Sequence, residues 1–132
     1  MKLKFPNVVL LLFLFTSVIG CGREKLPYEV VAVRGTVTSN GQPVPKGVRL
    51  QFAPVNGEGR PSDAIVGDDG KFKAIYTRSV EGVQVGKVTL TLSWSGDSAK
   101  VPADAAEILK KHRGGIPLEI TKPDKEFKIE LK

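Results

Sequence analysis

The chain has 132 residues, which is enough for one domain with its own core plus a short leader. Its formal charge of +6 comes from scattered basic residues with no run longer than Lys110-Lys111. That pattern argues against a nucleic-acid groove and indicates a mildly basic, solvated surface. Cys21 is the only cysteine, so a disulfide framework within the chain is excluded.

Residues 1–20 have the three zones of a secretory signal peptide. Lys2 and Lys4 give the start its charge, an apolar segment follows at residues 8–15, and small residues close the leader before Cys21. The apolar segment is much shorter than the ~20 residues that a membrane-spanning helix needs. We therefore predict a leader that is removed from the mature protein.

The end of the leader reads Val18-Ile19-Gly20-Cys21, which resembles the lipobox of bacterial lipoproteins. The resemblance implies cleavage between Gly20 and Cys21 and a lipid on the new N-terminal Cys21. Acyl chains at Cys21 would hold the protein at a membrane, since each buried methylene contributes about 0.8 kcal/mol. The alternative is an ordinary secretory leader followed by an incidental cysteine.

The lipobox resemblance also predicts where the protein resides. Gly22 stands where an aspartate is the familiar inner-membrane retention signal, so the outer membrane is favoured if the cell has one. We expect a membrane-anchored lipoprotein of the cell envelope that faces the periplasm or the exterior. Residues 21–29, broken by Pro27, read as a short tether, and residues 30–132 as the folded domain. Without the leader, 18 basic and 14 acidic residues leave a net charge of +4.

The domain opens with a predicted hairpin over residues 30–54. Valines alternate with polar residues in its first arm, and Val48, Leu50 and Phe52 alternate with polar residues in its second. Strict alternation of this kind is typical of half-buried strands. Asn40-Gly41 lies between the arms and tolerates the positive φ angles of a tight turn.

Further strands and one helix follow the hairpin. Five more strands are predicted, at residues 63–67, 71–77, 87–94, 116–120 and 127–131. Residues 102–112 open with proline, are rich in alanine, and carry acids early and bases late, which predicts one short helix. Seven strands at turn-marked spacing predict an all-β, Ig-like sandwich with one short helix before the last two strands. Pro117 places its strand at a sheet edge.

Three segments carry a resemblance to the carboxypeptidase-regulatory-like domain. They are the turn and strand at residues 34–52, the second turn Gly67-Asp68-Asp69-Gly70-Lys71-Phe72, and Val85-Gly86-Lys87-Val88-Thr89-Leu90. The third segment departs from the family pattern, because a valine stands where a tyrosine is usual. The resemblance covers roughly residues 30–95 and implies a transthyretin-like (prealbumin-like) seven-stranded sandwich.

We predict no catalytic, cofactor-binding or metal site in this sequence, and therefore no enzyme. His112 is the only histidine, and it lies among basic residues near a predicted helix end. Asp63, Asp68 and Asp69 are too few carboxylates to propose a calcium cage, which takes six or more oxygens. Trp94 falls on the inward register of its strand, where core packing is favoured, yet it ends the strand and is the one possible ligand contact.

These observations favour a non-catalytic, lipid-anchored interaction module that binds another envelope protein or assembly. The alternative is a carbohydrate or cell-wall binding domain, for which Trp94 would be the platform. Function on a sandwich tends to reside in the end loops, so residues 55–62, 78–86 and 96–101 are the expected binding surface. No nucleic-acid partner is expected, and the oligomeric state stays open.

Overall fold

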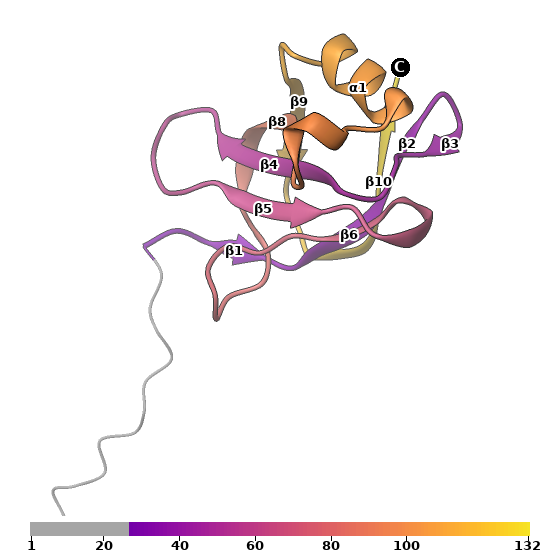
Figure 1. Cartoon of the computed structure of the whole chain (residues 1–132). Coiled ribbons are helices and arrows are strands. Elements are labelled where there is room, and N and C mark those ends of the chain that lie inside the picture. Colours follow the sequence, from indigo (N-terminus) through magenta and orange to yellow (C-terminus); the bar gives the residue numbers. More distant parts are fainter. Residues whose placement is uncertain (1–26) are drawn as a thin grey trace, which may run out of the picture.

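The structure, a computed structural model, describes residues 27–132 and is built mainly of β-strands with one α-helix (Figure 1). The strands are β1 (Val30–Val31), β2 (Val33–Ser39), β3 (Gln42–Pro43), β4 (Val48–Pro54), β5 (Ser62–Ile65), β6 (Lys71–Lys73), β7 (Val83–Gln84), β8 (Gly86–Trp94), β9 (Ile116–Ile120) and β10 (Asp124–Leu131). The helix is α1 (Ala103–Lys111), and short 3-10 turns lie at Asp68–Gly70 and Ser98–Lys100. Each predicted strand overlaps one of the longer strands, whereas β1, β3 and β7 have only two residues each.

Most strands belong to two four-stranded sheets. The first has the order β10-β2-β3 with β6 also paired to β2, and the second has the order β5-β4-β8-β9. Backbone bonds between Asp63 and Ile75, of 3.0 and 2.8 Å, join the sheets along the β5–β6 side. Phe52 of β4 and Phe72 of β6 meet across the core with ring centroids 5.9 Å apart. This arrangement agrees with the predicted all-β sandwich.

The core consists of the residues that alternation places inward. On β4, Val48, Leu50 and Phe52 are completely buried, while Arg49 is exposed. The same alternation holds on the other long strands and on the stretch after β6, as expected for strands with one buried face. The buried residues there include Val33, Val37, Phe72, Ala74, Tyr76, Val88, Leu90, Ile120, Ile129 and Leu131.

The predicted pairing of the two arms of the 30–54 hairpin is wrong. The chain turns after β2 at Asn40-Gly41 (φ 51° and 80°), and across this turn β2 pairs with the short β3 and not with β4. After Val44, whose N–H donates to the carbonyl of Val37 at 3.0 Å, Pro45 has no N–H to continue the ladder. The chain then crosses to the other sheet, where β4 pairs with β5 and β8. The tight turn is as predicted, but the arms lie in different sheets.

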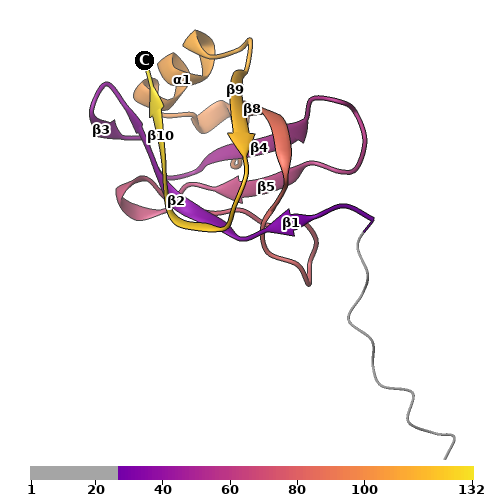
Figure 2. The same cartoon turned by 180° about the vertical axis from the view of Figure 1, so that it is seen from behind.

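The last strand, β10, runs parallel to β2 (Figure 2). Phe127 lies opposite Gly35 and Lys128 opposite Thr36, with an irregularity in register between Asp124 and Phe127. The backbones approach so closely there that a Cβ on Gly35 would stand 2.6 Å from the carbonyl carbon of Phe127. Glycine is therefore required at position 35 for the two strands to pair.

Helix α1 covers one end of the sandwich. Ala105 is completely buried, and Ile108 and Leu109 pack against the core. The helix begins after Pro102 and ends at Lys111, and the backbone N–H of the capping residue His112 donates to the carbonyl of Ile108 at 3.1 Å. Asp104 lies in its first turn and the bases Lys110 and Lys111 in its last, so the charges complement the helix dipole as predicted. Pro117 lies on the edge strand β9, also as predicted.

Candidate functional site

The predicted lipidation site, Cys21, and the residue before the cleavage point, Gly20, lie outside the described residues. The described chain reaches the domain at Glu29, whose carbonyl accepts a bond of 2.9 Å from the N–H of Val85. The tether therefore joins the domain next to β1 and β7, which pair with each other. We call this end of the sandwich the entry end.

The three loops expected to form one binding surface lie at opposite ends of the domain. Residues 55–62 and 78–86 meet at the entry end, where Gln84 Nε2 donates to the carbonyl of Glu58 at 3.2 Å. Residues 96–101 follow Trp94, which lies opposite Val48 at the other end of the β4–β8 pair. The three loops therefore do not form one continuous surface, because alternation along a strand does not reveal at which end each loop emerges.

Trp94 packs at the rim of the core. It lies opposite Val48 in the β4–β8 register and is only partly buried. Its ring lies against Gly47, where an added Cβ would stand 2.7 Å from Cη2. The ring thus covers the end of the core, which is the packing role that its inward register predicts.

We expect Trp94→Ala to lower the free energy of unfolding by roughly 2 kcal/mol, about half the cost of removing a fully buried aromatic ring. Trp94→Phe should retain most of that stability, because it keeps a ring over Gly47. Urea unfolding followed by circular dichroism measures both variants. If wall polysaccharide binds the wild type and the folded Trp94→Ala variant equally, Trp94 is not a sugar platform.

The acidic residues and the histidine that the sequence singled out do not form one cluster. Asp68 pairs with Lys46 at 3.6 Å, and Asp63 pairs with Arg49 at 3.2 Å. His112 is the residue that caps the C-terminal end of helix α1. Among residues 27–132, no group of three or more His, Cys, Asp or Glu side chains could hold a metal ion.

Arg34 of β2 and Glu81, in the segment before β7, form a bidentate ion pair. Arg34 Nε and Nη2 donate to the two carboxylate oxygens of Glu81 at 2.5 and 2.9 Å. These hydrogen bonds lower the pKa of Glu81, against a smaller opposing effect of burial, and Lys73 adds a weaker attraction. Both side chains are partly exposed, so solvent screens the pair.

A carboxyl whose pKa is lowered by folding stabilises the protein above its ordinary pKa, and this contribution disappears as pH falls through the lowered value. We expect Glu81→Gln to reduce stability slightly at neutral pH, by far less than a core substitution does. The difference between wild type and variant should vanish in acid. Urea unfolding at a series of pH values measures it, and a difference that stays constant as the pH falls contradicts this account.

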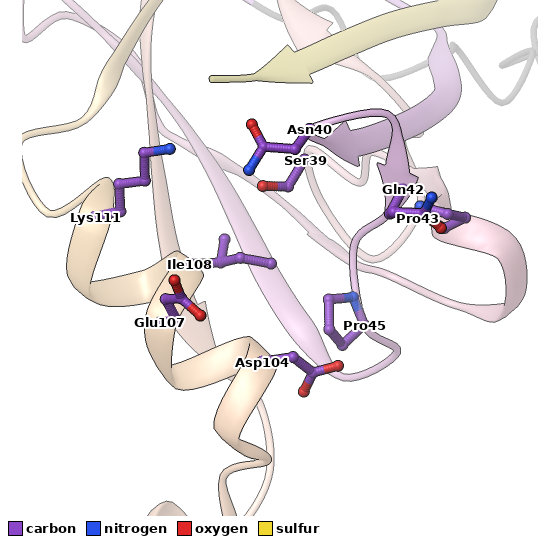
Figure 3. Close-up of a pocket in the computed structure, with 9 residues that line it drawn as sticks. All are labelled: Ser39, Asn40, Gln42, Pro43, Pro45, Asp104, Glu107, Ile108 and Lys111. Carbon is purple, nitrogen blue, oxygen red and sulfur yellow. The ribbon is translucent and has the colours of Figure 1, made fainter.

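A groove that the sequence did not predict lies between helix α1 and the β2–β3 hairpin (Figure 3). It has a volume of about 370 Å³. The helix contributes Asp104, Glu107, Ile108 and Lys111, and the hairpin contributes Ser39, Asn40, Gln42, Pro43 and Pro45. The helix residues occur at i, i+3, i+4 and i+7, so they share one face.

The groove combines an apolar floor with a polar rim. Ile108 points from the helix toward the hairpin, and Pro45 lies across from the helix (Figure 3). Asp104 and Glu107 place two carboxylates at the rim, and Lys111 places an ammonium group further along the helix. Such a surface can accommodate a small apolar side chain and pair with charged or hydrogen-bonding groups around it.

Comparisons of this chain with family models, with curated proteins and with solved structures find no match. Within residues 27–132, none of the helices combines the length and the apolar character needed to cross a bilayer. The function is therefore inferred from the residues of the chain and their arrangement.

Proposed function

We propose that this protein is a non-catalytic, lipid-anchored interaction module of the cell envelope, which binds another envelope protein. The anchor is the lipid on Cys21, as the lipobox resemblance implies. The seven strands longer than two residues form a transthyretin-like sandwich of the carboxypeptidase-regulatory-like kind, a proposal supported by the turn motifs around Asn40-Gly41 and Asp69-Gly70.

The position of the groove relative to the tether is the observation that carries this proposal. The chain enters at β1 and continues into β2, whose far end at Ser39 lines the groove. Seven residues of extended strand span roughly 20 Å. Figure 1 shows the same separation, with α1 and the β2–β3 hairpin at one end and β1 at the other. A partner can therefore occupy the groove while the opposite end of the domain is held close to a membrane.

The chemistry of the groove favours a protein segment as the partner. A surface with an apolar centre and a charged rim is the usual anatomy of a protein–protein contact. Ile108 supplies the apolar centre, and Asp104 and Glu107 favour a segment with a basic or amide side chain. We expect a modest interface, because the groove is small and open.

Crosslinking in intact cells, followed by mass spectrometry of the purified anchored protein, tests the proposal. We expect one recurrent envelope protein to be recovered with the wild type and lost with Ile108→Glu, which places a charge on the groove floor. Ser93→Glu, an exposed substitution outside the groove, is the matched control and should retain the partner. Recovery of the same partner with both variants would refute the groove as the binding surface.

A further inference from the structure

A row of cationic side chains lies on the outer face of the first sheet. Lys128 of β10, Thr36 of β2 and Lys71 of β6 are in register across three neighbouring strands. Two residues along the same strands, on the same face of the sheet, Arg34 lies opposite Lys73. Directly opposed residues project to the same side of a sheet, so these side chains share the face opposite to the buried Val33 and Val37. We call Arg34, Lys71, Lys73, Lys125 and Lys128 the basic face.

The basic face keeps an excess of positive charge. Its centre is a shallow hollow of about 590 Å³, lined by Arg34, Lys71, Lys125 and Lys128 and by a single acid, Glu126. Among the described residues, Arg34 is the one member of the face that forms an ion pair, with Glu81. All four lysines are exposed to solvent. Acids also lie around the edge of the face: Asp69 and Glu130 line a neighbouring hollow together with Lys128. At the central hollow, four bases against one acid still leave an excess of positive charge, which favours an anionic surface that covers it.

The basic face adjoins the point where the tether joins the domain. Asp124, next to Lys125, pairs with Val33, and its N–H donates to the carbonyl of Ala32 at 2.9 Å. Eight residues lie between Cys21 and Val30, so even a fully extended tether reaches only about 30 Å. A domain held this close to a bilayer meets its headgroups at high effective concentration.

We propose that the basic face docks on the anionic phospholipid headgroups of the membrane that holds Cys21. This inference rests on the proposed anchor and adds a second membrane contact to it, which fixes the orientation of the domain. Lysines near an anionic leaflet are attracted over about a Debye length, roughly 8 Å at physiological salt. No residue lines both the hollow and the groove beside α1, so membrane and partner can be bound together.

The test uses the full acylated protein reconstituted in vesicles of phosphatidylcholine alone or of equal parts phosphatidylcholine and phosphatidylglycerol. A water-soluble amine-acylating reagent is added, and the extent of labelling at each lysine is read by mass spectrometry. We expect labelling of Lys71 and Lys128 to fall about fivefold or more in the anionic vesicles, the factor that corresponds to one lysine contact. Lys100 and Lys110 are exposed and lie outside the basic face, in the turn before α1 and on α1, so they are internal controls and should label equally in both.

Two further arms make the result decisive. High salt should abolish the protection of Lys71 and Lys128, because it screens surface charge. The double substitution Lys71→Glu/Lys128→Glu should remove the protection of Lys125, whereas Lys100→Glu/Lys110→Glu should leave it intact. Equal labelling of the basic face in both kinds of vesicle overturns the inference. Failure of the anchor itself is distinguishable, since the protein would then not float with phosphatidylcholine vesicles at all.

Discussion

Gly35→Ala is expected to destabilise the protein by about 3 kcal/mol or more, a large part of the stability of a small domain. A Cβ at this position would collide with the carbonyl oxygen of Phe127. It would also stand 2.6 Å from the carbonyl carbon and 2.8 Å from the backbone nitrogen of the same residue. All three are backbone atoms, so relief requires the parallel β2–β10 pair to separate. Urea unfolding of the purified protein measures the loss.

Gly114→Ala is the matched control for this substitution. No atom outside its immediate neighbours lies within 4 Å of a Cβ built on Gly114. We expect its effect to stay within about 0.5 kcal/mol, as for most surface substitutions. If Gly35→Ala proved as mild as Gly114→Ala, the close approach of β10 to β2 would be wrong.

Cys21→Ser is expected to move nearly all of the protein from the membrane fraction to the soluble fraction. A serine has no thiol to receive the lipid, and several acyl chains are what a stable anchor requires. Fractionation by flotation should be done at low and at high salt. If the basic face contributes, some of the variant stays with membranes at low salt and leaves them at high salt.

Val18→Ala is a suitable control for this experiment, because it keeps Cys21 and the small residue before it. We expect this variant to float with membranes as the wild type does. Membrane association of Cys21→Ser that persists at high salt would contradict the lipid anchor at this residue.

Periodicity predicted the faces of the strands but not their partners. The inward set on β4 and β8 follows from alternation, because alternate residues of a strand point to opposite faces. Pairing depends on which segments far apart in the sequence meet, and local pattern carries no such information. The arms of the 30–54 hairpin were therefore joined wrongly, although Pro45 marks the point where the second arm leaves the first.

The parallel contact of β10 with β2 had one signal in the sequence. Gly35 interrupts the run of inward valines at Val33 and Val37, and a glycine inside a strand often marks a close backbone approach. The sequence did not predict which strand approaches Gly35, since β10 lies almost a hundred residues further along the chain.

The groove, like the strand pairing, could be predicted from the sequence only in part. The helix face with Asp104, Glu107, Ile108 and Lys111 is visible from its spacing, and the hairpin tip from Asn40-Gly41. Their meeting depends on α1 covering the end of the sandwich, which follows from the burial of Ala105. The packing of Trp94 against the core could be predicted, because its inward register on β8 is local information.

Site-specific photocrosslinking in living cells tests the central claim most directly. A photoreactive amino acid is placed at Glu107 in the groove, or at Glu58 at the entry end as the control, in the chain that retains Cys21. A crosslink from position 107 to one envelope protein, without the same product from position 58, is the predicted result. An identical set of crosslinks from both positions, or crosslinks from position 58 alone, would contradict a partner bound between α1 and the β2–β3 hairpin.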